Sequence, residues 1–209
     1  MRLKKYLVLG LVVLFVSSLA AEAGKTQENQ ESLNQSLRQE AIAGVIPALE
    51  DLIRRGAEIN GKAPHGETAL EYAIRFGRNG AALRLIQLGA DPNVEDDSGL
   101  TPLLRAAGEC NASRVVDALL RAGANVNHSD GYGRTALINA AHADCERTVA
   151  VLFLRAKQSV DIDARNDAFQ IASDLARNGP VMEMLEMAHK YQRRKKEDGA
   201  GLVQKPFNN

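Results

Sequence analysis

The chain has 209 residues, with 26 basic and 26 acidic side chains, two cysteines and no tryptophan. A balanced charge offers no overall attraction to nucleic acid, which excludes proteins that bind it through a strongly basic surface. The length suits a single domain, and because aromatic residues make up only 4% of the chain, its core must be mainly aliphatic.

The N-terminal segment has the pattern of a secretory signal peptide. Basic residues among the first five precede an almost unbroken apolar run over residues 6–20, and Ala21-Glu22-Ala23 is typical of a cleavage site. This run is shorter than the roughly 20 residues that span a bilayer. We therefore expect residues 1–23 to be removed on export to the periplasm, with secretion as an alternative. No stable membrane insertion should follow.

The mature chain then begins with a polar stretch, residues 24–34, which we expect to be a disordered linker. A helical domain should follow over residues 35–192. Its first part, residues 35–63, has apolar residues at helical spacing and ends in Gly-Ala-Glu-Ile-Asn, but it lacks the threonine that opens the later segments. We therefore predict that residues 35–63 cap one end of the domain.

The centre of the chain repeats itself every 33 or 34 residues. A threonine before alanine or proline suits a helix start, and a glycine suits the left-handed position that ends a helix. Since one such unit cannot bury its own apolar faces, the units must stack. The recurring positions are Thr68, Thr101 and Thr135; Gly56, Gly89 and Gly123; and Asn60, Asn93 and Asn127.

These residues resemble the ankyrin repeat, with its Gly-x-Thr-Pro/Ala-Leu opening, its Ala-Ala pair and its Gly-Ala-Asp-x-Asn close. The resemblance implies an all-α solenoid of stacked helix-turn-helix units with short projecting β-turn or hairpin loops, about five repeats including the caps. Residues 165–192 keep the pattern of two helices but lack most ankyrin signature residues, as expected of a C-terminal cap. Residues 193–209 should form a flexible tail.

The chain also departs from the ankyrin pattern. The histidine that often follows Thr-Pro-Leu is replaced by Glu71, Leu104 and Ile138, so we expect its usual hydrogen bonds to be absent. We call the repeats that open at Thr68, Thr101 and Thr135 the first, second and third repeats. The third repeat has no closing glycine, and residues 155–164 are expected to make a longer turn. This leaves the register of the last repeat open.

Cys110 and Cys145 occupy nearly the same position in adjacent repeats, and the segment that carries Cys110 has one extra residue. Two cysteines in an oxidising compartment can pair. Packed helices lie about 8–10 Å apart, whereas the Cα atoms of a disulfide lie about 4.4–6.8 Å apart. The extra residue could let the Cys110 loop bulge toward its neighbour. The sequence is compatible with either a Cys110–Cys145 disulfide or two free thiols.

One short pattern could carry chemistry. His142 and Cys145 have the spacing of half a metal site, with Cys110 one repeat earlier, and a Cys–His pair can also form a nucleophile. These residues follow a first helix, where ankyrin repeats vary, and a metal would need a further ligand. We therefore predict a non-enzymatic chain without metal or cofactor, and an enzyme or zinc protein is the alternative.

The resemblance implies that a protein partner binds the concave surface of first helices and turns. We predict that its residues are Tyr72, Arg75, Phe76, Arg105, Glu109, Asn139 and His142 on the helices and Leu100, Tyr132 and Arg134 in the turns. Similarity to exported bacterial ankyrin proteins suggests an immunity protein that neutralises a secreted toxic effector, such as a type VI phospholipase. A scaffold for an envelope enzyme, for example in peroxide defence, and an effector that binds a host protein are alternatives. We expect a monomer.

Overall fold

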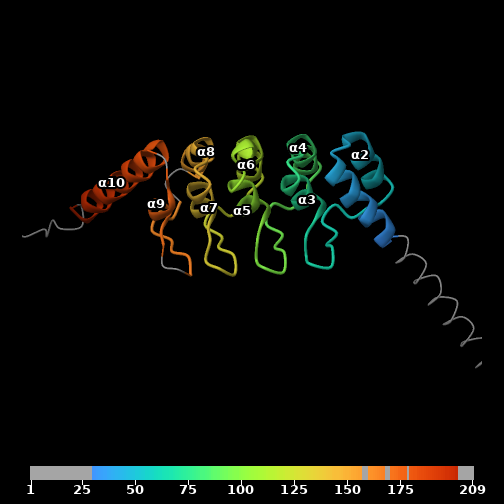
Figure 1. The fold of residues 1–209 in the computed structure, drawn as a ribbon, viewed down its shortest axis with the longest axis horizontal. Coiled ribbons are helices and arrows are strands. Elements are labelled where there is room, and N and C mark those ends of the chain that lie inside the picture. The colour runs from blue at the N-terminus through green and yellow to red at the C-terminus, as the bar shows by residue number, and fades with distance from the viewer. Residues whose placement is uncertain (1–29, 157–159, 168–169, 178, 202–209) are drawn as a thin grey trace, which may run out of the picture.

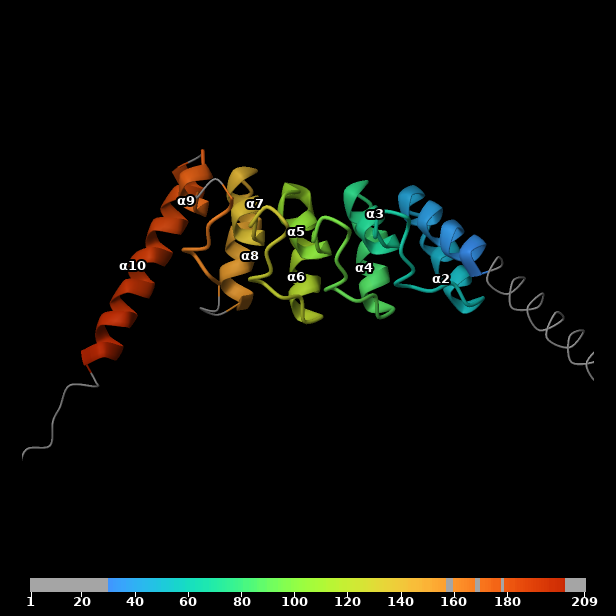
Figure 2. The same cartoon turned by 90° about the horizontal axis from the view of Figure 1, so that it is seen from below.

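The computed structural model describes residues 30–156, 160–167, 170–177 and 179–201 (Figure 1). Its helices form pairs that stack side by side in one elongated row, with the turns projecting from one edge (Figures 1 and 2). The described residues contain no β-strand beyond an isolated bridge between Ser129 and Thr135. The predicted all-α solenoid is therefore confirmed. The predicted signal peptide lies outside the described residues.

The helices form an inner layer next to the turns and an outer layer above it (Figure 1). The inner layer contains α3 (Ala69–Arg75), α5 (Pro102–Ala107), α7 (Ala136–His142) and α9 (Ala172–Leu175). The outer layer contains α2 (Ile46–Arg54), α4 (Asn79–Gln87), α6 (Ser113–Arg121), α8 (Glu146–Ala156) and α10 (Gly179–Gly201). Residues 30–43 are also helical, and a 3₁₀ helix, η1 (Cys110–Ala112), precedes α6.

The threonines and glycines of the repeat act as the sequence predicts. Thr68, Thr101 and Thr135 are the N-caps of α3, α5 and α7, and each hydroxyl accepts a hydrogen bond from the backbone N–H three residues later, at 3.3–3.4 Å. The glycines that follow α2, α4 and α6 have φ values of 101°, 93° and 93°. These values lie in the left-handed region, where glycine avoids the strain of a side chain.

The core lies between the two layers and is aliphatic. Its buried apolar residues are mainly alanine, leucine, valine and isoleucine. No aromatic side chain is among the buried residues of the described part of the chain. Fully buried members include Leu70, Ala73, Leu85, Leu103, Ala106, Leu119, Ala140, Val149 and Leu152.

The closing asparagines link each turn to the next. Each one accepts a hydrogen bond, through its side-chain oxygen, from a backbone N–H of the following turn. We call this series the asparagine ladder. The last bond places Asp161 where Asp91 and Asn125 stand in earlier turns, which settles the register of the last repeat. The bonds are Asp91 to Asn60 (2.9 Å), Asn125 to Asn93 (2.8 Å) and Asp161 to Asn127 (2.8 Å).

Both ends of the domain extend further than the sequence boundaries. Residues 30–34, which we assigned to the linker, are already helical. Asn34 is buried against the domain, and its side chain accepts a hydrogen bond from the N–H of Glu58 at 2.8 Å. This hydrogen bond is like those of the asparagine ladder, although Asn34 lies in a helix and not in a turn. Residues 193–201, assigned to the tail, continue α10, in keeping with the helix-forming glutamate, lysine and arginine there.

Candidate partner-binding surface

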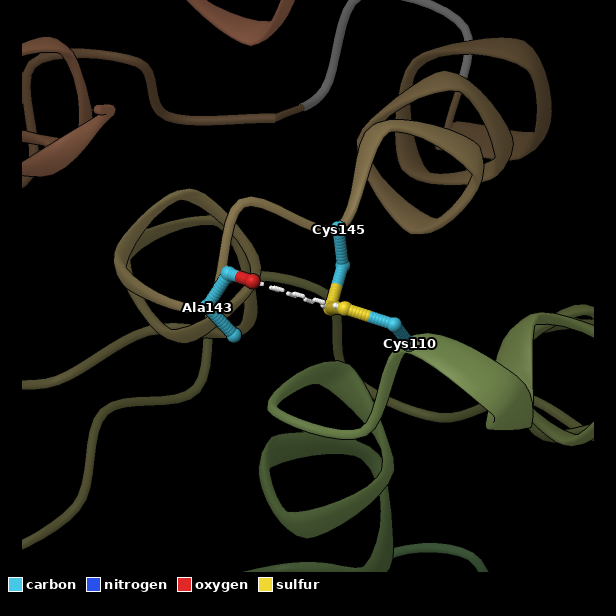
Figure 3. The surroundings of a disulfide bond; sticks show 3 residues. All are labelled: Cys110, Ala143 and Cys145. Carbon is cyan, nitrogen blue, oxygen red and sulfur yellow. Dashed lines mark hydrogen bonds between the residues drawn. A yellow bond between two sulfur atoms is a disulfide. The ribbon is translucent and has the colours of Figure 1, made fainter. Parts of the chain in front are cut away.

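Cys110 and Cys145 form a disulfide that joins the second repeat to the third (Figure 3). Their Cα atoms are 4.8 Å apart, inside the range that a disulfide needs. The carbonyl oxygen of Ala143 lies 3.4 Å from Sγ of Cys110. A sulfur atom held in a disulfide is neither a nucleophile nor a thiolate ligand, so this pairing removes the basis for a metal or catalytic site at His142 and Cys145.

The extra residue of the second repeat explains the short distance. In the first and third repeats a left-handed residue follows the inner helix, Gly77 with φ 67° and Asp144 with φ 54°. In the second repeat, the 3₁₀ helix η1 takes this place. It carries Cys110 toward the third repeat, as expected of a bulged loop.

Two further findings concern chemistry and membranes. No three His, Cys, Asp or Glu side chains gather into a group that could hold a metal ion within the part of the chain that the structure describes. None of the described helices combines the length and the apolar character that crossing a membrane requires.

The structure places the predicted surface residues in two groups. Some are exposed on the inner layer and the turns, and Phe76 and Tyr132 are 47% and 59% exposed. Others lie lower and contact neighbouring side chains. Arg75, Phe76, Glu109, His142 and Tyr132 are exposed, whereas Tyr72, Leu100, Arg105, Arg134 and Asn139 are half-buried.

Arg105 lies at the centre of an ion-pair network between the first two repeats. Its Nη2 atom is 3.4 Å from Oε1 of Glu67 and 3.2 Å from Oδ2 of Asp96, and Arg75 approaches the same Glu67 oxygen to 2.8 Å. The side chains of Glu67 and Asp96 are only 10% exposed. Arg105 compensates the charge of Asp96, and Arg105 and Arg75 together compensate that of Glu67. We call Glu67, Arg75, Asp96 and Arg105 the charge network.

Asp96 also holds its own turn. Its Oδ1 atom accepts hydrogen bonds from the backbone N–H groups of Ser98 (2.9 Å) and Leu100 (3.0 Å). Burial alone raises the pKa of Asp96, but these hydrogen bonds, the Ser98 hydroxyl and the Arg105 charge outweigh it and lower the pKa. Asp96 therefore stays ionised and keeps the turn and Arg105 in place.

Glu71 forms hydrogen bonds that the sequence did not lead us to expect. It stands where ankyrin repeats often have histidine, and it is fully buried. Its Oε2 atom accepts hydrogen bonds from the Thr68 N–H (2.8 Å) and hydroxyl (3.3 Å), a capping box. Glu71 thus makes capping hydrogen bonds at the position where the histidine and its usual hydrogen bonds are missing. Burial raises its pKa to about 7, against the lowering effect of the Thr68 hydrogen bonds and the Arg105 charge.

In the third repeat, two predicted surface residues also contact their own chain. Asn139, at the position equivalent to Arg105, donates a hydrogen bond to the carbonyl oxygen of Leu104 at 3.0 Å. Arg134 pairs with the buried carboxylate of Asp130 at 2.6 Å, and its guanidinium carbon lies 5.0 Å from the centre of the Tyr132 ring. These contacts hold Arg134 and Tyr132 in fixed positions at the edge of the surface.

The sequence analysis missed Glu67 and Asp96. Glu67 precedes Thr68 as Leu100 precedes Thr101, so aligning the repeats could have identified it once Leu100 was chosen. Asp96 could have been found by the same alignment, because Asp96 and its counterpart Asp130 each stand three residues before a glycine. What the sequence does not reveal is that one arginine joins both carboxylates.

Comparison with known proteins points to the same repeat. A family model described as ankyrin repeats (3 copies) matches residues 78–166. The neurogenic locus Notch protein of Drosophila melanogaster is 37% identical over 142 residues, which cover 67% of this chain and 5% of that protein. The neurogenic locus notch homolog protein 1 of Xenopus laevis is 28% identical over 201 residues, which cover 80% of this chain and 8% of that protein.

The ankyrin repeat domain-containing protein SAT10 of Stachybotrys chartarum is 32% identical over 126 residues, which cover 60% of this chain and 6% of that protein. This chain spans less than a tenth of the length of each of these relatives, so the likeness concerns the repeats. Ankyrin repeats imply a module for protein–protein interaction. The helical stack around residues 78–166 is therefore an ankyrin-repeat solenoid.

Proposed function

We propose that this chain is a non-enzymatic protein-binding module that acts in the periplasm through its inner helices and turns. The observation that carries this proposal is a row of exposed side chains where α3, α5 and α7 end. Phe76, Glu109 and His142 occupy nearly equivalent positions of successive repeats, and all three are exposed. They combine an apolar, an acidic and a titratable side chain on rigid elements, a mixture suited to recognising a protein surface.

The contacts below this row support a binding role because they fix its geometry. The charge network joins the first repeat to the second, and the disulfide joins the second repeat to the third. A surface that is already ordered loses less conformational entropy when a partner binds. The half-buried Arg105 and Asn139 therefore act as supports, while Phe76, Glu109, His142 and Tyr132 are the residues that a partner can reach.

Export to the periplasm has two independent supports. Residues 1–23 have the pattern of a signal peptide, and the chain pairs its two cysteines, which is typical of oxidising compartments. Cell fractionation and N-terminal sequencing test this location. We expect a periplasmic chain that begins near Gly24 and carries no free thiol. A chain found in the cytoplasm with residues 1–23 intact would contradict the proposal.

Within this class we propose an immunity role, in which the chain binds and neutralises a secreted toxic effector. The rigid surface suits an inhibitor, which must cover its target without rearrangement. Resemblance to exported bacterial ankyrin proteins is the reason for choosing an effector as the target. A scaffold for an envelope enzyme would use the same surface but would raise or preserve the activity of its partner.

Affinity capture from the envelope fraction tests the surface and the role together. The partner captured by the unmodified chain is purified, and its activity is measured with and without the chain. Inhibition supports the immunity role, whereas stimulation indicates a scaffold. Phe76→Ala/His142→Ala should lose the partner, and Arg114→Ala, an exposed change on α6, should retain it. Equal capture by all three proteins would contradict the proposed surface.

A further inference from the structure

Helix α10 is held to the stack by one face. Val181 and Leu185 are fully buried, and the side chain of Gln192 donates a hydrogen bond to the carbonyl oxygen of Val160 at 3.2 Å. The ring of His189 lies 3.6 Å from the carboxylate of Asp163. These four residues of α10 recur at helical spacing, so they lie along one side of the helix. The opposite side of the helix is exposed.

That opposite side carries a row of four exposed residues, Glu183, Met187, Tyr191 and Arg194, which we call the α10 row. Their spacing of four, four and three residues places them along one stripe of the helix. Met187 and Tyr191 are 61% and 56% exposed. The row is thus acidic near the start of the helix, apolar in the middle and basic further along.

We infer that the α10 row binds the α10 row of a second copy of this chain, with the two helices antiparallel. The midpoint between Glu183 and Arg194 falls between residues 188 and 189, and the midpoint between Met187 and Tyr191 falls at residue 189. A two-fold axis at this point brings each Glu183 toward Arg194 of the second copy. It also brings each Met187 toward Tyr191 of the second copy.

Charge selects this arrangement over a parallel one. Parallel helices in register would place Glu183 beside Glu183 and Arg194 beside Arg194, and like charges at such distances destabilise a pair. The antiparallel pair replaces both repulsions with attractions. It forms each contact twice, as a two-fold interface requires.

Helix α8 adds apolar surface beside the row. Phe153 and Leu154 of α8 line a groove together with Met184, Met187 and Tyr191 of α10, and Leu154 is 75% exposed. Figure 2 shows that α10 runs at an angle to α8, whereas α4, α6 and α8 are nearly parallel, so the two helices diverge along the groove. A second α10 would cover this groove. Because the contact is small, the dimer should be weak and concentration-dependent.

Sedimentation velocity of the purified chain over a wide range of concentration tests this inference. The unmodified chain should shift from monomer to dimer, and Met187→Glu should remain monomeric because it places a charge at the apolar centre. Glu183→Arg and Arg194→Glu should each weaken the dimer by about tenfold, since each creates two like-charge contacts. Glu183→Arg/Arg194→Glu should restore it, because the attractions return with their signs exchanged.

Two controls complete the experiment. Arg114→Glu makes the same charge change as Arg194→Glu on α6, outside the α10 row, and should leave the dimer unchanged. A mixture of the two single variants should form heterodimers more readily than either variant forms homodimers. The inference is overturned if the unmodified chain is monomeric at every concentration. It is equally overturned if the double variant fails to recover the dimer while circular dichroism shows that it is folded.

Discussion

The interface between the first and second repeats and that between the second and third share one geometry but not one chemistry. In the first interface, Arg105 joins the carboxylates of Glu67 and Asp96 near the start of the inner helices. In the second, a disulfide joins Cys110 to Cys145 beyond the ends of the inner helices. Aliphatic packing and the asparagine ladder serve both interfaces. The additional contacts therefore decide how each interface responds to pH and to reduction.

Equivalent positions show how this difference arises. Arg105 and Asn139 occupy the same place in successive repeats, yet Arg105 reaches two carboxylates and Asn139 reaches the backbone oxygen of Leu104. The reason lies one turn earlier, because Glu67 precedes the first N-cap whereas the apolar Leu100 precedes the second. An arginine in place of Asn139 would therefore lack the counterpart of Glu67, and the counterpart of Asp96, Asp130, already pairs with Arg134.

Breaking the disulfide should have the largest effect on stability. The cysteines are 35 residues apart, and a loop of this size contributes about 3–4 kcal/mol to the free energy of unfolding. Cys110→Ser/Cys145→Ser should lower the urea midpoint accordingly. A reductant should bring the unmodified chain to the same midpoint without moving that of the variant. Equal urea midpoints for the unmodified chain and the variant, both without reductant, would show that the second interface does not need the disulfide.

The pH response of the first interface should come next. The pKa of Glu71 is 4.5 in ordinary surroundings and about 7 in the fold, so the folded chain holds this proton more tightly than the unfolded chain. The free energy of unfolding should therefore fall as the pH rises from 4.5 to 7, by at most about 3 kcal/mol. Glu71→Gln should reduce this fall, measured by urea unfolding at about pH 5 and about pH 8. An identical fall in Glu71→Gln would rule out Glu71 as its source.

Removing the central cation of the charge network should have a moderate effect. Arg105→Met takes the arginine from Asp96 and leaves Glu67 with only the half-exposed Arg75, so it should lower the free energy of unfolding by about 2 kcal/mol. Arg75→Met is a matched control, because Arg75 is half exposed and its loss should cost less than about 1 kcal/mol. Urea unfolding at neutral pH measures both. If Arg105→Met and Arg75→Met lower the free energy of unfolding equally, burial of the carboxylates does not determine the cost of removing an arginine.

The smallest effect on stability is expected at the exposed surface, outside both interfaces. Phe76→Ala and Tyr132→Ala should change the free energy of unfolding by less than about 0.5 kcal/mol, because both side chains are exposed. If these residues are binding anchors, each change should weaken partner binding by about tenfold or more. Calorimetric titration of the captured partner measures this. A loss of stability equal to the loss of binding would place both residues in the core instead.

The sequence could predict the features that depend on local signals. Threonine caps, left-handed glycines and the 33- or 34-residue spacing act within one repeat, so the helices and their stacking could be inferred. The disulfide was one of two options, because normal helix spacing is too wide and only the 3₁₀ helix η1 closes the gap. The charge network was not foreseen, since it joins Glu67 to Arg105 through turn conformations that no short segment encodes. The partner-binding surface stays a prediction.

The asparagine ladder has a consequence for how such a gene can change in length. Each ladder bond ties a turn only to its neighbour, so duplication or loss of a stretch from one asparagine to the next leaves every remaining bond intact. An extra residue is accommodated where the ladder does not pass, in the segment that carries Cys110. An insertion between Asp91 and Asn93 would instead shift the next ladder bond out of step. The stretch of this chain that can be duplicated or lost as a unit is therefore the span between two ladder asparagines.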